Sequence, residues 1–320
     1  MNSSRRLLAL LFLGSSLWGC SAMAADFPVK TVRLVVPFPP GGATDAMARL
    51  MAEKLSEKWK QPVVVENKPG ANTAIGTDVV AKSAPDGHVL GMVTGSHVTN
   101  VLLGAKLPYD TLKDLTGVMQ LTRFHMAIYA HPSLHANTPA EFLELAKKNP
   151  PLSYASATTQ SYLGMSLLNM MAKTPMEYVA YKGSAQALND VLGGHIMLMI
   201  DPVLHSTLQH VQSGKLKLIG TLGSKSADLT PNTPAFGKLV PGYDFSGVFG
   251  LVARAGTPPA LVRQIRNDFA SVMQQPEVAE RIRSIGQEAI VSTPDEYNAY
   301  ILDEMKKWAP VVQATGAKLD

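Results

Sequence analysis

The sequence predicts an α/β protein with two lobes, each built on a βαβαβ unit. Apolar runs of strand length alternate with amphipathic helical segments, and this alternation occurs twice along the 320-residue chain. Right-handed crossovers between parallel strands place the first strand of each unit in the middle of its sheet. Ligands of such sheets bind beyond the carboxyl ends of the strands, where the strand order reverses. We therefore expect loops from both lobes to face one cleft.

The N-terminus predicts export from the cell. Arg5 and Arg6 precede an apolar run, and an A-x-A cleavage site ends at Ala24, so residues 1–24 are interpreted as a signal peptide. The only cysteine of the chain, Cys20, lies inside this segment. Lipid attachment at Cys20 is the competing interpretation to cleavage after Ala24. After cleavage the chain has no thiol, so its stability depends on packing rather than on disulfides.

The overall charge argues against a nucleic-acid partner. The formal net charge of the whole chain is +4, and loss of the two arginines of the signal peptide lowers it to +2. This balance is too even for a nucleic-acid-binding protein. No stretch outside the signal peptide approaches the ~18 apolar residues of a membrane span. We expect a monomeric exported protein.

The first lobe begins after the signal peptide. The buried pattern of residues 32–36 is typical of a central strand, and the apolar positions Met47, Met51 and Leu55 recur at helical spacing. In order, the expected elements are a strand at 32–36, a helix that begins just after Gly42, a strand at 63–67, a helix at about 73–83 and a strand at 89–94. Residues 95–97 then form a loop beside the first one, and residues 107–118 are mostly turn.

The loop between the first strand and the first helix is the candidate anion site. Pro37, Pro39 and Pro40 hold it extended, while Gly41 and Gly42 let the backbone turn and leave N–H groups exposed at the positive end of the helix. GxxxxGK[ST] and GxGxxG are both absent. A carboxylate is therefore a better candidate than a phosphate. An ordinary strand-to-helix turn is the alternative.

The second lobe repeats the pattern of the first. Residues 119–131 cross into it and residues 248–253 cross back, so lobe 1 comprises residues 25–122 and 249–320, and lobe 2 comprises residues 123–248. The elements expected in lobe 2 are a helix at 138–148, strands at 152–156, 178–181, 196–200 and 216–222, and helices from 161 and from 184. Helices at 258–273, about 278–285 and from 293 past 308 complete lobe 1. Two crossings form a hinge on which a cleft can open and close.

The motifs of common enzyme classes are missing. G-x-S-x-G, HExxH and CxxC do not occur, and the eight histidines form no metal-binding pattern. The methionine-rich residues 165–176 are interpreted as core filler rather than as a soft-metal site. Ser96 with His97, Lys182 and Asp201 are each able to act in catalysis, but no second titratable group is placed beside them, so ligand binding is favoured. If Asp201 faces the cleft as an anion, it favours an ammonium or hydroxyl on the ligand.

The chain resembles the solute-binding receptors of the tripartite tricarboxylate transporter family, also called Bug or TctC proteins. The resemblance covers residues 28–308 and rests on the motifs VPFPPGGATD (36–45), VVENKPGANTAIGTDVVAKSAPDGHVL (64–90), LPYDTLKDLTGV (107–118), AYKGSAQALNDVLGGHIMLMID (180–201) and AGTPPALV (255–262). It implies a periplasmic binding protein of type II with neither catalysis nor a cofactor or metal. It also implies that a small carboxylate, which is a di- or tricarboxylate, an amino acid or an aromatic acid, is presented to integral membrane transporter subunits. The alternatives are an enzyme acting on small organic acids and a sensor that presents its ligand to a signalling receptor.

The resemblance also implies a set of ligand-binding residues. From lobe 1 these are Phe38, Gly41, Gly42, Ala43, Asp45, Ser96 and His97, and from lobe 2 they are Ser156, Thr158, Thr159, Ser161, Tyr181, Lys182, Gly183 and Asp201. The chain departs from the family where a glycine-containing Ser-x-Gly-x-Gly-Ser-like loop is replaced by SATTQS (156–161), and where Ala180 replaces a common proline. The identity of the ligand is therefore not carried over from any relative.

Overall fold

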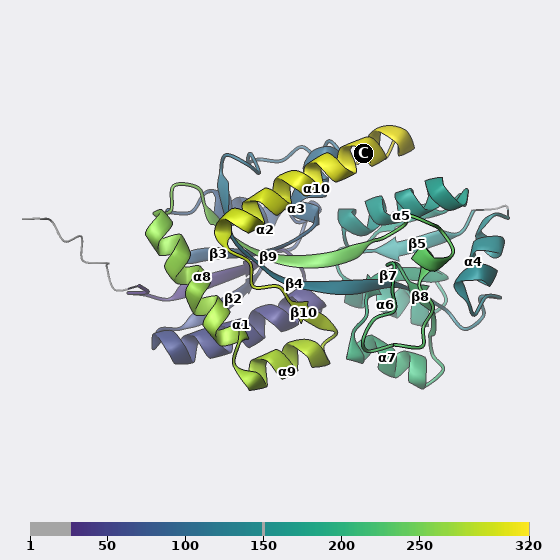
Figure 1. The fold of residues 1–320 in the computed structure, drawn as a ribbon, viewed down its shortest axis with the longest axis horizontal. Coiled ribbons are helices and arrows are strands. Elements are labelled where there is room, and N and C mark those ends of the chain that lie inside the picture. The colour runs from purple at the N-terminus through teal and green to yellow at the C-terminus, as the bar shows by residue number, and fades with distance from the viewer. Residues whose placement is uncertain (1–26, 149–150, 320) are drawn as a thin grey trace, which may run out of the picture.

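The computed structural model describes residues 27–148 and 151–319. Figure 1 shows two lobes side by side, with long strands running between them and the C-terminal helix along one side. The strands form one curled mixed sheet with the order β2-β1-β3-β9-β4-β7-β5-β6. This architecture confirms the predicted two-lobed α/β fold. The predicted signal peptide and Cys20 lie outside the described residues.

The first lobe has the predicted βαβαβ order. It contains β1 (Val32–Val36), α1 (Ala43–Trp59), β2 (Val63–Asn67), α2 (Ala74–Ala81), β3 (Val89–Thr94) and α3 (Ser96–Leu102). β1 pairs in parallel with β2 on one side and with β3 on the other, so it is central. Met47, Met51 and Leu55 of α1 are fully buried. α3 replaces the loop that we expected at residues 95–97, because Val98 and its neighbours are buried in the core.

The second lobe repeats this arrangement. It contains α4 (Pro139–Ala146), β5 (Ser153–Ser156), α5 (Thr159–Ala172), β6 (Glu177–Ala180), α6 (Ser184–Leu192), β7 (Leu198–Pro202), α7 (His205–Gln212), β8 (Lys217–Thr221) and the 3-10 helix η1 (Phe236–Lys238). β5 pairs in parallel with β6 and β7 and is central, as predicted. α7 was not expected. It forms because Thr207 and Leu208 are buried and Val211 packs against the same core, while His205, Ser206 and Gln209 are exposed.

One strand belongs to both halves of the sheet. β4 (Leu115–Ala130) pairs along residues 115–125 with β9 (Ser246–Arg254), and residues 126–130 pair with β7 and β8. β4 begins inside the segment that we expected to be turn, and it also pairs with the short strand β10 (Gln287–Ala289), which was not expected. The predicted lobe boundaries at 122/123 and 248/249 fall within β4 and β9. The change of lobe therefore takes place inside paired strands, and these boundaries stay predictions.

The C-terminal helices begin on the first lobe. α8 (Pro259–Met273) and α9 (Pro276–Ser284) precede α10 (Pro294–Thr315). This helix opens with a capping box, in which Thr293 N–H donates to Glu296 Oε2 at 2.7 Å and Glu296 N–H donates to Thr293 Oγ1 at 3.2 Å. α10 lies across both lobes (Figure 1). Its far end places Trp308 edge-on against Phe245, with the ring centroids 6.1 Å apart. The last helix thus packs on both lobes rather than on the first alone.

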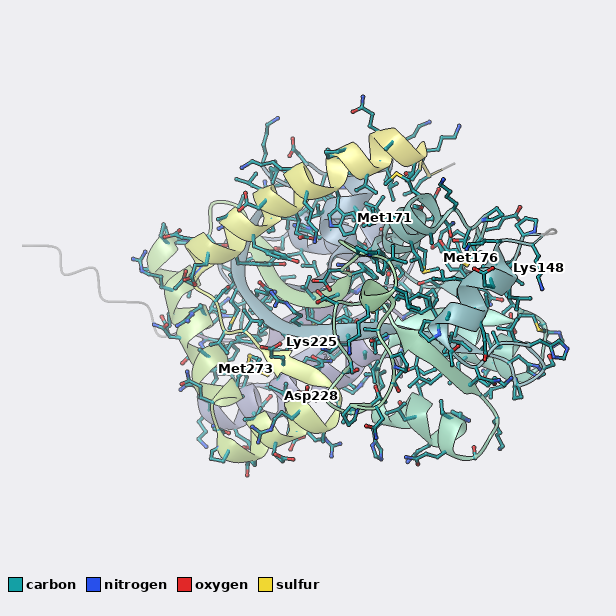
Figure 2. All side chains as sticks on the ribbon, turned by 45° about the vertical axis from the view of Figure 1, so that its right-hand side comes forward. Lys148, Met171, Met176, Lys225, Asp228 and Met273 are labelled. Carbon is teal, nitrogen blue, oxygen red and sulfur yellow. The ribbon has the colours of Figure 1, made fainter. Side chains whose placement is uncertain are left out.

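Methionines fill the cores of both lobes. Met176 and Met273, labelled in Figure 2, are buried, and so are Met165 and Met199. The unbranched thioether side chain fits irregular gaps between larger residues. This supports the interpretation of the methionine-rich segment as core filler, although Met170 in the same segment is 43% exposed.

Candidate functional site

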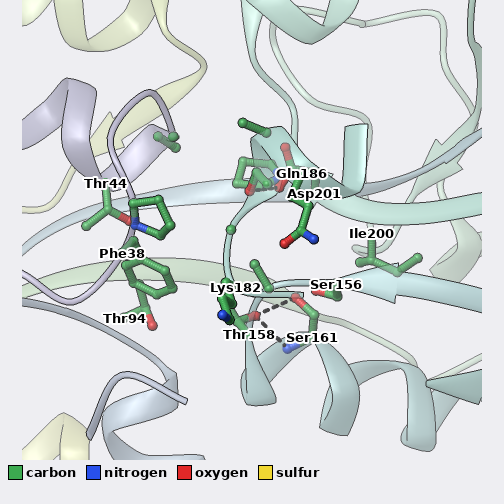
Figure 3. A pocket seen from close by; sticks show the side chains of 18 of the residues that line it. Phe38, Thr44, Thr94, Ser156, Thr158, Ser161, Lys182, Gln186, Ile200 and Asp201 are labelled. Carbon is green, nitrogen blue, oxygen red and sulfur yellow. Dashed lines mark hydrogen bonds between the residues drawn. The ribbon is translucent and has the colours of Figure 1, made fainter. Parts of the chain in front are cut away.

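A cavity of about 350 Å³ lies between the two lobes. Its walls are formed by the loops that follow β1, β5 and β6 and by the end of β7, together with side chains of β3, β4 and β9. Figure 3 shows Phe38, Thr44 and Thr94 of lobe 1 facing Ser156, Lys182 and Asp201 of lobe 2. The predicted residues that line the cavity are Phe38, Gly42, Ala43, Ser156, Thr158, Ser161, Lys182, Gly183 and Asp201. The carboxyl ends of strands from both lobes therefore meet at one cavity, as the topology predicts.

The loop after β1 presents backbone amides to this cavity. Gly41 has φ +91°, a conformation that favours glycine, and Gly42 is the N-cap of α1 and offers no side-chain acceptor. Within the described residues, no acceptor contacts the N–H groups of Ala43 and Thr44 at the start of the helix. Free N–H groups at the positive end of a long helix form an anion-binding surface.

Asp45 stabilises this loop rather than lining the cavity. Its carboxylate accepts hydrogen bonds from Gly41 N–H at 3.0 Å, from Arg49 Nε at 2.9 Å and from Asn67 Nδ2 at 2.9 Å. Burial acts to raise the pKa of Asp45, but the bonds from these three groups outweigh it and lower the pKa. Asp45 therefore holds the turn at Gly41 in place as an anion.

The second lobe directs two further helix N-termini at the cavity. α5 is capped by Thr158, whose Oγ1 accepts from Ser161 N–H at 3.1 Å and lies 2.7 Å from Ser161 Oγ (Figure 3). α6 begins after Gly183, which has no capping side chain. The exposed Lys182 stands beside this helix start and lines the cavity. The positive ends of α1, α5 and α6 and the ammonium of Lys182 make the site favourable for an anion.

Asp201 is the buried acid of the site. It is 5% exposed, and its Oδ1 accepts a hydrogen bond from Ser184 Oγ at 2.5 Å. Burial raises the pKa of Asp201 to about 7, and the Ser184 hydroxyl opposes this shift only in part. The carboxyl group is therefore able to change its charge near neutral pH.

The remaining wall of the cavity is apolar. Phe124 and Phe249 of the crossing strands lie with their ring centroids 4.6 Å apart, and Met126 and Ile200 continue the same wall. Sequence reasoning did not select these residues, because their orientation depends on how the shared strand curls. It also did not select Ser184 or Thr94. Ser184 could have been selected because it directly follows Gly183, and Thr94 because it ends the third strand.

Several predicted residues lie away from the cavity. Ser96 and His97 belong to α3 and are buried, and neither Ser96 Oγ nor His97 Nδ1 has a hydrogen-bond partner among the described residues. His97 instead lines a separate cavity of about 200 Å³ with Thr111 and Asn298. Burial lowers the pKa of His97 to about 4, so the imidazole is neutral at physiological pH.

Thr159 and Tyr181 make contacts inside the protein. Thr159 Oγ1 lies 2.7 Å from Asn100 Oδ1, to which it donates, and 2.9 Å from Thr99 Oγ1 of the other lobe. Tyr181 donates its hydroxyl to Asp190 Oδ2 at 2.7 Å, a bond that raises the pKa of Tyr181 to about 12. Gly41 does not line the cavity, and it contributes through the backbone conformation that shapes the loop after β1. Ligand contact by these residues, and by Asp45, Ser96 and His97, stays a prediction.

The lobes touch on two sides of the cavity. The Thr159 contacts close one side, where the Gln160 side chain also packs against Gly95 of lobe 1. On another side, Pro39 packs so closely on Gly183 that a Cβ atom added there would lie 3.0 Å from the proline Cδ. Contacts between the lobes therefore border the cavity on two sides.

A cavity enclosed between two α/β lobes, with a shared strand between them and helix N-termini at its walls, defines a two-lobed solute-binding protein. The same class follows from comparison with known sequences. The chain belongs to the family described as "Tripartite tricarboxylate transporter family receptor", whose model matches residues 47–317. This confirms the resemblance stated above. The family consists of periplasmic binding proteins, so the chain is a receptor rather than an enzyme.

Individual relatives match over nearly the whole chain. Protein BugT of Bordetella pertussis is 31% identical over 326 residues, which cover 100% of both chains. The solved structure of R. palustris Rpa4515 with adipate has a TM-score of 0.86 at 29% identity and covers 92% of this chain and 100% of that one. MatC (Rpa3494) from Rhodopseudomonas palustris with bound malate has a TM-score of 0.82 at 29% identity and covers 89% and 100%.

Proposed function

We propose that this protein captures a small carboxylate in the cavity between its lobes and presents it to a tripartite tricarboxylate transporter in the membrane. The observation that carries the proposal is the set of free N–H groups at the start of α1, which face the cavity beside Gly42. The relatives solved with adipate and with malate support a carboxylate as the ligand. We also propose that residues 1–24 are removed on export. The mature protein is proposed to be a monomer.

Binding of the carboxylate to lobe 1 is the first step of the proposed mechanism. One ligand carboxylate accepts hydrogen bonds from the amides of Ala43 and Thr44, directly or through water, at the positive end of α1. A hydrogen bond to a charged acceptor contributes about 1.5 to 3 kcal/mol. Four such bonds at the upper end of this range, less the smallest association cost of about 4 kcal/mol, reach about −8 kcal/mol, which corresponds to a micromolar dissociation constant.

Closure of lobe 2 over the ligand is the second step. The N-termini of α5 and α6 approach the ligand from the opposite wall, and the contacts of Thr159 and Pro39 described above form between the lobes. Because the lobes are connected through the paired strands β4 and β9, they move as rigid bodies about this connection. The closed form is the one that a transporter recognises as loaded.

A pair of substitutions at Gly42 tests the carboxylate site. The φ of Gly42 is −87°, and a Cβ added there meets no atom within 4 Å, so both Gly42→Ala and Gly42→Leu leave the fold intact. The alanine variant is the matched control, because it loses the same backbone freedom without filling the cavity. In a thermal-shift screen of mono-, di- and tricarboxylates, we expect Gly42→Leu to abolish the shift and Gly42→Ala to retain it. Equal shifts in wild type and Gly42→Leu would contradict the proposal.

Delivery to a transporter and processing of the N-terminus need separate measurements. Cells that lack this chain are expected to lose uptake of the carboxylate found in the screen, and growth with normal uptake would contradict delivery. Mass spectrometry of the exported protein is expected to show a chain that begins at Ala25. A lipid-modified chain that begins at Cys20 would favour the alternative.

A further inference from the structure

Asp201 leaves one carboxylate oxygen free in the wall of the cavity. The residue lies near the end of β7, where pairing with Ala127 of β4 fixes its position in the sheet. Oδ1 accepts from Ser184 Oγ, whereas Oδ2 has no hydrogen-bond partner among the described residues. Oδ2 is not one of the atoms that the protein encloses completely, in contrast to Ser96 Oγ. A ligand in the cavity is therefore able to reach Oδ2.

The surroundings of Asp201 offer no cation to pair with this oxygen. Met126 and Ile200 form the neighbouring apolar wall. Among the ionisable neighbours, Tyr129 of β4 turns its hydroxyl to the Pro202 carbonyl at 3.3 Å, and no described cation shifts the pKa of Asp201. Lys182 lies at the exposed edge of the cavity and makes no ion pair with Asp201. The free oxygen is thus an isolated acceptor in an apolar wall.

The bond to Ser184 stabilises the ionised form of Asp201 and in part offsets the effect of burial. Ser184 Oγ donates to Oδ1 at 2.5 Å, a distance typical of a hydroxyl bonded to a carboxylate. A second donor, placed at Oδ2 by a ligand, would stabilise the same anion and lower the raised pKa of the group. A ligand carboxylate at this position would instead meet a like charge or require a bound proton.

We propose that Asp201 selects carboxylates that carry a hydrogen-bond donor, a hydroxyl or an ammonium, on the part of the ligand that lies against lobe 2. This inference rests on the proposed function and names the ligand class of the same site. A ligand without the donor buries Oδ2 unpaired, and the loss of such a bond weakens binding by about tenfold to a hundredfold.

Two series of ligands with a constant carbon skeleton test the selection. Succinate, malate and aspartate differ only in carrying a hydrogen, a hydroxyl or an ammonium on the second carbon, and adipate, 2-hydroxyadipate and 2-aminoadipate form the matching six-carbon series. In titration calorimetry of the wild-type protein, we expect the hydroxy or the amino acid of at least one series to bind about tenfold tighter than its parent diacid or better. The ratio of affinities is the readout, since it cancels effects common to all ligands.

Substitutions of Asp201 distinguish the two donors. Asp201→Asn keeps an oxygen acceptor but removes the charge, so it is expected to retain the preference for a hydroxyl and to lose that for an ammonium. Asp201→Ala should remove both preferences. Glu177→Gln is the matched control, an acid-to-amide change at an exposed position of lobe 2 outside the cavity, and it should leave every ratio unchanged. Thermal unfolding of each variant verifies the fold, and Asp201→Asn alone suffices if the alanine variant does not fold.

The outcomes separate this inference from the proposed function. Equal binding of all members of both series, or tighter binding of the parent diacids, overturns the selection by Asp201 but leaves a carboxylate receptor. A preference for donors that survives in both Asp201 variants also overturns it. If neither these ligands nor the wider carboxylate screen gives binding, the proposed function fails, and the inference fails with it.

Discussion

Replacement of Asp201 by asparagine should change how the stability of the protein depends on pH. Burial raises the pKa of Asp201 from its ordinary value of 3.8 to about 7 in the folded protein. Between these two values the unfolded chain has lost the proton, whereas the folded chain keeps it. The free energy of unfolding therefore falls as pH rises, by about 1.4 kcal/mol per pH unit. The stability that the protonated group contributes is fully present below about pH 4 and is lost as pH rises through 7.

The magnitude follows from the separation of the two pKa values. A change from 3.8 to about 7 corresponds to a loss of about 4 kcal/mol by pH 8. Asparagine does not ionise, and its Oδ1 can still accept the hydrogen bond of Ser184. The stability of Asp201→Asn relative to wild type should therefore grow by about 4 kcal/mol between pH 4 and pH 8.

His97 opposes this trend on the acid side. Burial lowers the pKa of His97 from 6.5 to about 4, so the unfolded chain binds a proton in this window that the folded chain does not bind. Its contribution is present above about pH 6.5 and is lost, by about 3 kcal/mol, as pH falls through 4. The slopes of Asp201 and His97 cancel in wild type between about pH 4 and 6.5. Asp201→Asn should expose the rising slope of His97.

Urea unfolding at a series of pH values between about 4.5 and 8.5 measures these slopes. We expect the stability of Asp201→Asn to rise more steeply than that of wild type between about pH 4.5 and 6.5 and then to level, while wild type falls toward pH 7. Adding His97→Asn to the first variant should lessen the rise and leave the part contributed by His125, whose pKa burial also lowers. Parallel curves for wild type and Asp201→Asn, separated by a constant offset, would refute the reasoning.

Three further substitutions probe contacts between or within the lobes. Trp308→Ala removes a fully buried side chain and should destabilise the protein by about 3 to 5 kcal/mol in urea unfolding; a loss below about 1 kcal/mol would show that α10 adds little. Thr159→Val leaves Asn100 Oδ1 without its donor and should weaken ligand binding by about tenfold in calorimetry, whereas unchanged affinity would mean that this contact does not depend on closure. Gly286→Ala places a Cβ 2.0 Å from the Val203 carbonyl at φ +77°, so its melting temperature should fall clearly; an unchanged value would speak against this packing.

The central strands were predictable because their sequences carry a strong local pattern. β1 is an apolar run between turn residues, and chain topology then fixes its central place. β5 has the short sequence SYAS, and its central place follows from the repeat of the first unit's topology. α3 was not predictable in this way. Its residues Ser96, His97 and Thr99 are polar, and the helix forms because its surroundings in α5 and α10 bury it. In α3, tertiary packing overrides the local helix propensity of the sequence.

In the candidate site, too, the local sequence predicts some of the residues, and only the tertiary structure brings the others to the cavity. The loops after β1, β5 and β6 lie at the cavity, since the end of a strand fixes where the next loop starts, whereas α3 replaces the loop expected after β3. Phe124, Met126 and Phe249 lie in the middle of strands, and only the curl of β4 and β9 brings them to the cavity. His97 also follows a strand end, but a helical turn there carries its side chain into another part of the core. The sequence pattern does not show how a helix is rotated about its axis, so it does not show where the side chain of His97 lies.

Because β4 belongs to both halves of the sheet, it is difficult to exchange one half of this protein for the corresponding half of a relative. A chimera that joins one half of this chain to the other half of a relative must cut or replace a strand whose two ends belong to different halves of the sheet. The junction would also have to reproduce the register shifts between Gly117 and Met119 and between Gln120 and Thr122. Exchange of whole halves is thus a poor route to new receptors. Diversification of ligand preference in such a scaffold is expected to proceed by point changes in the connections after the strands.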